Sequence, residues 1–112
     1  MELIGVIETS PFLTATRKLM DDDERAQLVD YLASSPMAGD LIPGTGGVRK
    51  LRWALEGRGK RGGARVIYYF HNEDIPLFIL TVYAKNVRGD LSGAERNDFK
   101  RLTKILAESY GK

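Results

Sequence analysis

The residues best suited to chemistry are the Lys and Arg side chains between residues 44 and 69, where seven cations stand against a single acid, Glu56. The whole chain has a net charge of only +2, so positive charge is concentrated in this stretch. Within it the segment GRGKRGG contains four glycines and no bulky apolar residue. Glycine lets a polyanion approach the main chain, and Lys and Arg neutralise phosphates. The pattern therefore predicts an RNA-facing surface, whose cations are Arg49, Lys50, Arg52, Arg58, Lys60, Arg61 and Arg65.

Aromatic residues lie close to this basic stretch in the sequence. Tyr69 is in phase with Arg65 along a predicted strand, whereas Tyr68 points to the other face. Tyr83 lies in the next predicted strand. Rings interleaved with cations are typical of platforms on which unpaired bases stack. A solvated hairpin that only keeps the protein soluble is the simpler alternative, but it does not explain why four cations fall within residues 58–65.

Several other kinds of site are not expected. The chain has no cysteine, which excludes disulfides, thiolate metal ligands and a cysteine nucleophile. Its single histidine, His71, cannot form a Cys/His zinc site. The acidic run at residues 21–24 is explained by a helix N-terminus, where negative charge is favoured. The glycine-rich segments lack the Lys-Ser/Thr of a phosphate-binding loop. We therefore expect no metal and no cofactor.

Length and composition predict one domain over residues 1–112. The chain is 43% hydrophobic and 29% charged, as is usual for a globular protein. No apolar run approaches the roughly 20 residues needed to span a bilayer, and the N-terminus does not have the pattern of a signal peptide. We expect a cytoplasmic protein with no membrane partner.

Two helices are predicted before the basic stretch, after a first strand at residues 1–8. The first helix begins at Ser10, which can cap it, with Pro11 in its first turn. The second starts in the acidic run and ends near residues 34–36. Its predicted buried residues are Leu28, Tyr31 and Leu32.

Three strands and a last helix are predicted after the glycine-rich connector at residues 37–47. The strands cover residues 48–55, 65–71 and 76–84, and the helix at 92–110 begins with a capping-box spacing. In the first strand Lys50 and Arg52 lie opposite the apolar face. In the third, one face is predicted to hold Thr81 and Tyr83 and the other to hold Phe78, Leu80, Val82 and Ala84.

The element order β-α-α-β-β-β-α predicts an α+β fold. We expect a small, mainly antiparallel sheet with the helices packed on one face. The other face would then be free to bind a ligand.

Three sequence blocks resemble a known protein family: GDLIPGTGGVRKLRW, GKRGGARVIYYF and LTVYAKN…DLS. Together they resemble the RelE/ParE superfamily of bacterial type II toxins, and most closely its HigB-like branch. The resemblance implies a small endoribonuclease that cuts mRNA, typically in the ribosomal A site, and so inhibits translation. It also implies a metal-independent reaction, because the RNA 2′-hydroxyl attacks the neighbouring phosphate.

The resemblance also assigns roles to residues. Arg65 corresponds to the strand arginine of the family active site, Lys60 and Arg61 to its basic loop, and Lys85 to the basic residue after the last strand. It implies that Arg65 and Lys85 contact the scissile phosphate and that Lys60 or Arg61 transfers protons. The remaining predicted RNA-binding residues are Arg49, Lys50, Arg52, Arg58, Tyr69 and Tyr83.

Partners follow from the same resemblance. It implies a cognate antitoxin, commonly a helix-turn-helix protein from the same operon, and contact with operator DNA only through that antitoxin. The other expected partners are mRNA and the ribosome. Two alternatives stay open: a ParE-like poison of DNA gyrase without nuclease activity, and a non-catalytic RNA-binding module.

Overall fold

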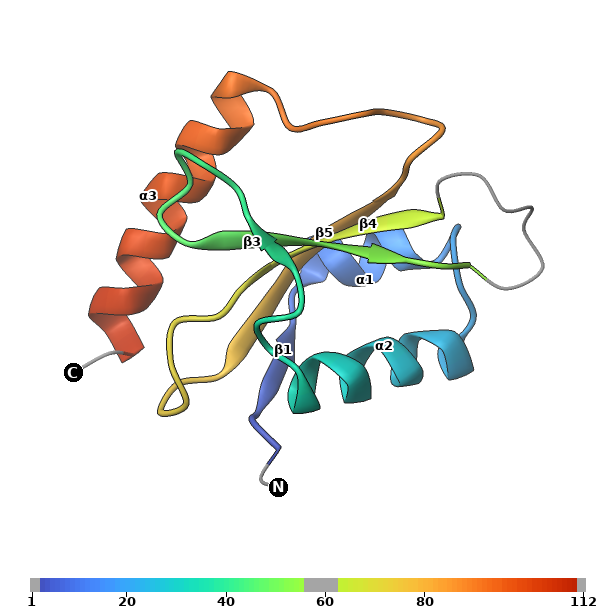
Figure 1. Ribbon diagram of the computed structural model, residues 1–112, viewed down its shortest axis with the longest axis horizontal. Coiled ribbons are helices and arrows are strands. Elements are labelled where there is room, and N and C mark those ends of the chain that lie inside the picture. Colours follow the sequence, from blue (N-terminus) through green and yellow to red (C-terminus); the bar gives the residue numbers. More distant parts are fainter. Residues whose placement is uncertain (1–2, 56–62, 111–112) are drawn as a thin grey trace.

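The computed structural model describes residues 3–55 and 63–110, and these residues form five strands and three helices (Figure 1). The predicted α+β class is confirmed, and the order differs from the prediction only by a two-residue strand in the glycine-rich connector. No helix in the described ranges is long and apolar enough to cross a membrane. The elements are β1 (Val6–Glu8), α1 (Ser10–Thr16), α2 (Asp22–Ser34), β2 (Asp40–Leu41), β3 (Val48–Trp53), β4 (Ala64–Tyr69), β5 (Leu77–Ala84) and α3 (Gly93–Tyr110).

The strands form one sheet in the order β1-β5-β4-β3-β2. Strand β1 runs parallel to β5, and all the other pairs are antiparallel, so the predicted mainly antiparallel sheet is confirmed. Strand β4 lies at the centre, and each of its six residues is buried. A side chain on β4 is therefore held by neighbours on both sides.

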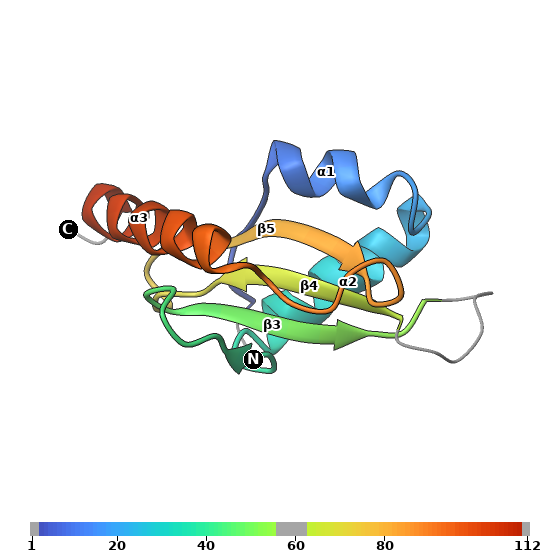
Figure 2. The ribbon, with the colours of Figure 1, turned by 90° about the horizontal axis from the view of Figure 1, so that it is seen from above.

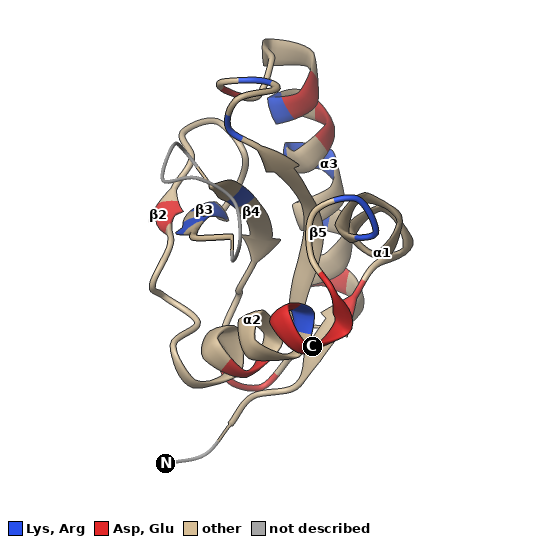
Figure 3. Cartoon of the chain, turned by 90° about the vertical axis from the view of Figure 1, so that its right-hand side faces the viewer, with Lys and Arg blue, Asp and Glu red and all other residues tan. Residues whose placement is uncertain are grey.

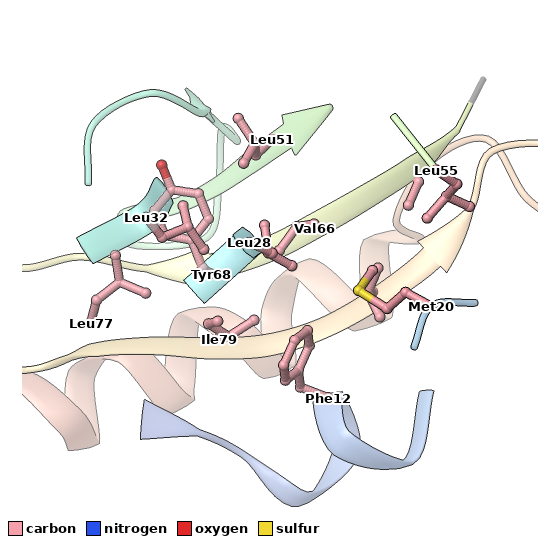
Figure 4. Close-up of a cluster of buried hydrophobic side chains, with 12 residues drawn as sticks. Phe12, Met20, Leu28, Leu32, Leu51, Leu55, Val66, Tyr68, Leu77 and Ile79 are labelled. Atoms are coloured by element: carbon pink, nitrogen blue, oxygen red, sulfur yellow. The ribbon is translucent and has the colours of Figure 1, made fainter. Parts of the chain in front are cut away.

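The helices cover both faces of the sheet, so the prediction that they pack on one face is wrong. Helices α1 and α2 cover one face, where Phe12 and Leu28 pack on Val66, Tyr68 and the side chains around them (Figure 4). Helix α3 covers part of the other face, on the other side of the sheet from α2 (Figure 1). The reason is that β4 and β5 carry apolar side chains on both faces. If helices covered only one face, the apolar side chains of the other would be exposed to water.

A β-bulge in β5 changes the predicted faces of that strand. Ile67 pairs with Thr81 and the next residue, Tyr68, pairs with Ile79, so Leu80 is the extra residue. Phe78 and Leu80 face α3 together with Tyr83, whereas Val82 joins the cluster under α1 and α2. Grouping Val82 with Phe78 and Leu80 was wrong, because alternation does not hold across a bulge.

The helix starts are only partly as predicted. Thr9, not Ser10, occupies the cap position of α1, and its hydroxyl donates to the Ile79 carbonyl at 2.7 Å. Asp21 caps α2 by accepting from the Glu24 N–H at 2.8 Å. The predicted capping box of α3 is confirmed by reciprocal bonds between Ser92 and Glu95. The prediction that Tyr31 is buried is wrong: it is 41% exposed and contacts the rim of the sheet at Trp53.

Candidate active site

Arg52, Arg65 and Tyr83 lie side by side across three strands. Arg52 of β3 pairs with Arg65 of β4, and Arg65 pairs with Tyr83 of β5. Paired residues point to the same face of a sheet, and here it is the face that α3 partly covers. Helix α3 packs over the opposite end of this face, near Val48 and Tyr69. The row of three residues is therefore next to the part of the sheet that α3 leaves open.

A cleft of about 310 Å³ adjoins this row. Its cationic side chains come from β3 and from the first turn of α3, and its acids from β2 and from the connection between β5 and α3. That connection runs back along the sheet before α3 begins (Figure 2). The cleft is lined by Asp40, Leu41, Ile42, Pro43, Lys50, Arg52, Asp90 and Arg96.

Within the cleft a carboxylate lies among cations. The Lys50 Nζ is 3.0 Å from the Asp90 Oδ1. The hydrogen bond and charge of Lys50 lower the pKa of Asp90, and the charges of Arg96 and Lys85 act in the same direction. Three cations, from β3, from α3 and from the start of the connection itself, thus stabilise one anion at this point. The same arrangement suits an RNA phosphate, which carries the same charge and also accepts hydrogen bonds.

Arg65 is only 8% exposed, although it is charged. Its position at the centre of the sheet explains this burial, because β3 and β5 cover it from both sides. One of its guanidinium nitrogens lies 3.3 Å from the Ala64 carbonyl. A charged group is seldom buried unless its environment stabilises it, and here the buried arginine lies beside a cationic cleft.

The connection between β5 and α3 is held over Tyr83. The Arg88 guanidinium lies 4.7 Å from the centre of the Tyr83 ring, and the Tyr83 hydroxyl lies 3.3 Å from the Gly89 carbonyl. Arg88 also pairs with Glu95, and this bond lowers the pKa of Glu95 to about 2. One side of the Tyr83 ring is thus taken by Arg88, so the ring supports the loop that carries Asp90.

Most of the predicted site residues that the structure describes lie at or beside the cleft. Lys50 and Arg52 line it, and Arg65 and Tyr83 adjoin it. Lys85 follows directly on β5, where it is exposed and its N–H donates to the Gly63 carbonyl at 3.1 Å. Three predicted residues lie outside the described residues: Arg58, Lys60 and Arg61.

Two of the predicted RNA-binding residues lie away from the cleft. Arg49 points to the α2 face, where it donates to the Gly39 carbonyl at 2.7 Å. Tyr69 is 3% exposed and bonds His71 at the far end of the sheet.

Sequence reasoning missed three residues of the site: Arg88, Asp90 and Arg96. All three follow the last predicted strand, outside the basic stretch on which the prediction rested. Their only signal in the sequence was their charge, because the fold of the connection decides that they meet β3.

A family model described as the RelE toxin of the RelE/RelB toxin–antitoxin system matches residues 6–112, and the chain belongs to this family. Among solved structures, the chain is similar to a double arginine-to-alanine mutant of the E. coli toxin RelE in the free state. The two share 19% identity over 94% of this chain and 99% of that one, with a TM-score of 0.55, so this likeness shows the fold. Membership of the HigB-like branch stays a prediction.

Proposed function

We propose that this RelE-family toxin is an endoribonuclease that cuts mRNA on the ribosome and thereby inhibits translation. The observation that supports it best is the row of Arg52, Arg65 and Tyr83 beside a cleft lined by Lys50 and Arg96. Four cations from three elements converge there, and Asp90, which pairs with Lys50, occupies a position suited to a phosphate.

The reaction needs no nucleophile from the protein. The RNA 2′-oxygen forms a bond to the adjacent phosphorus, the bond from phosphorus to the 5′-oxygen breaks, and a 2′,3′-cyclic phosphate and a 5′-hydroxyl result. One proton leaves the 2′-hydroxyl and one is delivered to the 5′-oxygen. The protein contributes orientation, proton transfer and stabilisation of the negative charge in the transition state.

Each cation has a role in this proposal. Arg65 and Lys85 contact the scissile phosphate, and the burial of Arg65 keeps its guanidinium oriented. Lys60 or Arg61 transfers protons. Lys50, Arg52 and Arg96 bind the phosphates on either side. No metal or cofactor takes part in the scheme.

The partners belong to the same proposal. The toxin acts in the cytoplasm on mRNA and the ribosome, and an antitoxin from its own operon holds it inactive. We assign it to the HigB-like branch, where the antitoxin carries a helix-turn-helix domain and is the part that contacts operator DNA. The cationic cleft suits an antitoxin that lays an acidic segment over it.

Primer extension on a reporter mRNA in a cell-free translation system tests the proposal. Wild type is compared with Arg65→Ala, with Arg52→Ala as an exposed variant of the same row and Arg17→Ala as a surface control on another face. Cuts that follow the reading frame and disappear in both row variants, but not in the control, are expected. Intact mRNA with wild-type protein would overturn the proposal, and inhibition of supercoiling by gyrase in the same preparation would identify the alternative class.

A further inference from the structure

Helix α3 carries two cations, Lys100 and Lys104, that the proposed active site does not use. Arg96, Lys100 and Lys104 recur every four residues, so they follow one another along the same side of the helix. Arg96 lines the cleft, and the other two line a separate hollow. At a rise of about 1.5 Å per residue, the stripe from Arg96 to Lys104 is about 12 Å long.

No described acid interrupts this stripe. Of the acids of α3, Glu95 and Asp98 pair with Arg88 and Arg101, and Glu108 follows Lys104 by four residues, so it lies on the same side of the helix and ends the stripe. Elsewhere Asp and Glu gather where α2 begins (Figure 3), and α2 covers the opposite face of the sheet from α3. Among the described residues, no acid forms an ion pair with Arg96, Lys100 or Lys104.

The hollow at the far end of the stripe combines cations with aromatic rings. Its volume is about 330 Å³. The Tyr69 hydroxyl lies 2.9 Å from the His71 Nδ1, and burial raises the pKa of Tyr69, so this hydroxyl keeps its proton. When it donates to Nδ1, the Nε2 of His71 carries a proton and is a hydrogen-bond donor. The hollow is lined by Gly46, Tyr69, His71, Lys100, Thr103, Lys104 and Ala107.

The cleft and the hollow follow one another along α3 and along the loop between β2 and β3. The loop between β2 and β3 contributes Ile42 and Pro43 to the cleft and Gly46 to the second hollow. It is fastened to α3 between them, because the Thr103 hydroxyl donates to the Thr45 carbonyl at 3.0 Å. Along β3, Arg52 and Val48 are four residues apart, which is about 13 Å and matches the length of the stripe.

We infer that the RNA path continues from the cleft along α3, with Lys100 and Lys104 binding phosphates and the hollow at Tyr69 and His71 receiving a nucleotide away from the cut. The inference rests on the proposed function. A single strand fits this surface because its charges repeat regularly, as the three cations do, and because its bases stack on exposed rings such as His71. At 3.4 Å per stacked nucleotide, about 12 Å corresponds to roughly three to four nucleotides.

Binding of two fluorescent oligodeoxynucleotides of different length tests the inference, since DNA lacks the 2′-hydroxyl and is not cut. A strand of about two nucleotides is shorter than the stripe and can fill the cleft alone, whereas a strand of about ten nucleotides also reaches the hollow. The test variant is Lys100→Ala/Lys104→Ala, in which both side chains are exposed. The matched control is Arg17→Ala/Lys18→Ala, which removes the same charge from the end of α1.

We expect the α3 variant to bind the long strand about tenfold more weakly at low salt and the short strand normally. Because two phosphate contacts are lost, the salt dependence of log K should become shallower by about 1.4. His71→Ala should also weaken only the long strand. Equal losses for both lengths, losses as large in the control, or no loss would overturn the inference.

The same assay separates this inference from the proposed function. Arg52→Ala should weaken both strands, and loss of mRNA cleavage tests the cleft by itself. If wild type binds the long strand through Lys100 and Lys104 but cuts nothing, the proposed nuclease fails and the α3 surface remains. If decaglutamate competes for Lys100 and Lys104 while the long strand does not depend on them, the surface is a protein-binding site and the inference is wrong.

Discussion

Lys50 of β3 and Asp90 of the connection between β5 and α3 form an ion pair of 3.0 Å at the edge of the cationic cleft. Their positions are 40 residues apart in the sequence. The carboxylate occupies space beside Lys50 that an RNA phosphate would need. Because the Asp90 side chain is 65% exposed, the pair is readily exchanged for another anion.

Removing the charge of Asp90 should strengthen binding of nucleic acid. In Asp90→Asn the Lys50 ammonium no longer has a competing carboxylate, so affinity for a short oligodeoxynucleotide should rise about two- to fivefold at low salt and little at high salt. Fluorescence anisotropy at two salt concentrations measures it. Asp74→Asn, in the turn between β4 and β5, is the control for the change in net charge. Weaker binding by the Asp90 variant would mean that the carboxylate positions Lys50 for its ligand.

Two arginines of β3 should behave in opposite ways. Arg52 lines the cleft, whereas Arg49 lies on the α2 face and bonds the Gly39 carbonyl. Arg52→Ala should lower RNA binding with little change in stability, because its side chain is exposed. Arg49→Ala should keep RNA binding and lower the free energy of unfolding by about 1 kcal/mol, since it loses a hydrogen bond from a charged group. Oligonucleotide binding and urea unfolding of both variants give the answer, and equal loss of binding would contradict the assigned faces.

The cleavage rate should depend on the shape of the Arg65 side chain as well as on its charge. Arg65→Ala is expected to lower the cleavage rate by about 10²-fold or more, the usual effect of removing a group that stabilises transition-state charge. Arg65→Lys should recover only a small part, because lysine lacks the planar fork of donors. Single-turnover cleavage measures both, and far-UV circular dichroism checks folding. Full activity in Arg65→Lys would show that a point charge is sufficient.

Gly46 and Gly44 form a matched pair in the loop between β2 and β3. Both have positive φ, +77° and +79°, so alanine is strained at either position. A Cβ at Gly46 would also come within 2.4 Å of the Thr103 hydroxyl oxygen, whereas nothing lies within 4 Å of one at Gly44. Gly44→Ala should cost about 1 kcal/mol and Gly46→Ala clearly more. Thermal unfolding measures the difference, and equal costs would mean that α3 does not pack on this loop.

The stability that Glu95 contributes at the start of α3 should be lost in acid. Its bond with Arg88 holds the pKa of Glu95 at about 2, below the ordinary value of 4.5. A lowered pKa stabilises the folded state above pH 4.5, and this contribution disappears as the pH falls toward 2. Glu95→Gln should therefore lower the melting temperature at pH 7 and match wild type near pH 2. Glu108→Gln, near the end of the same helix, is the control. A difference between wild type and Glu95→Gln that is constant with pH would contradict the assignment.

Local features of the chain determined much of this protein by themselves. The alternation at residues 48–55 predicted the faces of Lys50 and Arg52, and the spacing of Ser92 and Glu95 predicted the start of α3, because both depend only on local geometry. The three sequence blocks identified the superfamily. Tyr83 was expected in the strand next to that of Arg65, but the register that pairs the two residues came from the structure.

Only the tertiary structure decided what surrounds those residues. The bulge at Leu80 redirected the side chains of β5, and the placement of α3 on the second face divided the sheet into a covered end and an open one. Arg49 was predicted to bind RNA from its charge, but its face of the sheet belongs to α2. Asp90 and Arg96 reach Lys50 only because the connection after β5 folds back over the sheet. Contacts between segments far apart in the sequence depend on how whole helices and strands pack, and local sequence patterns carry no information about that packing.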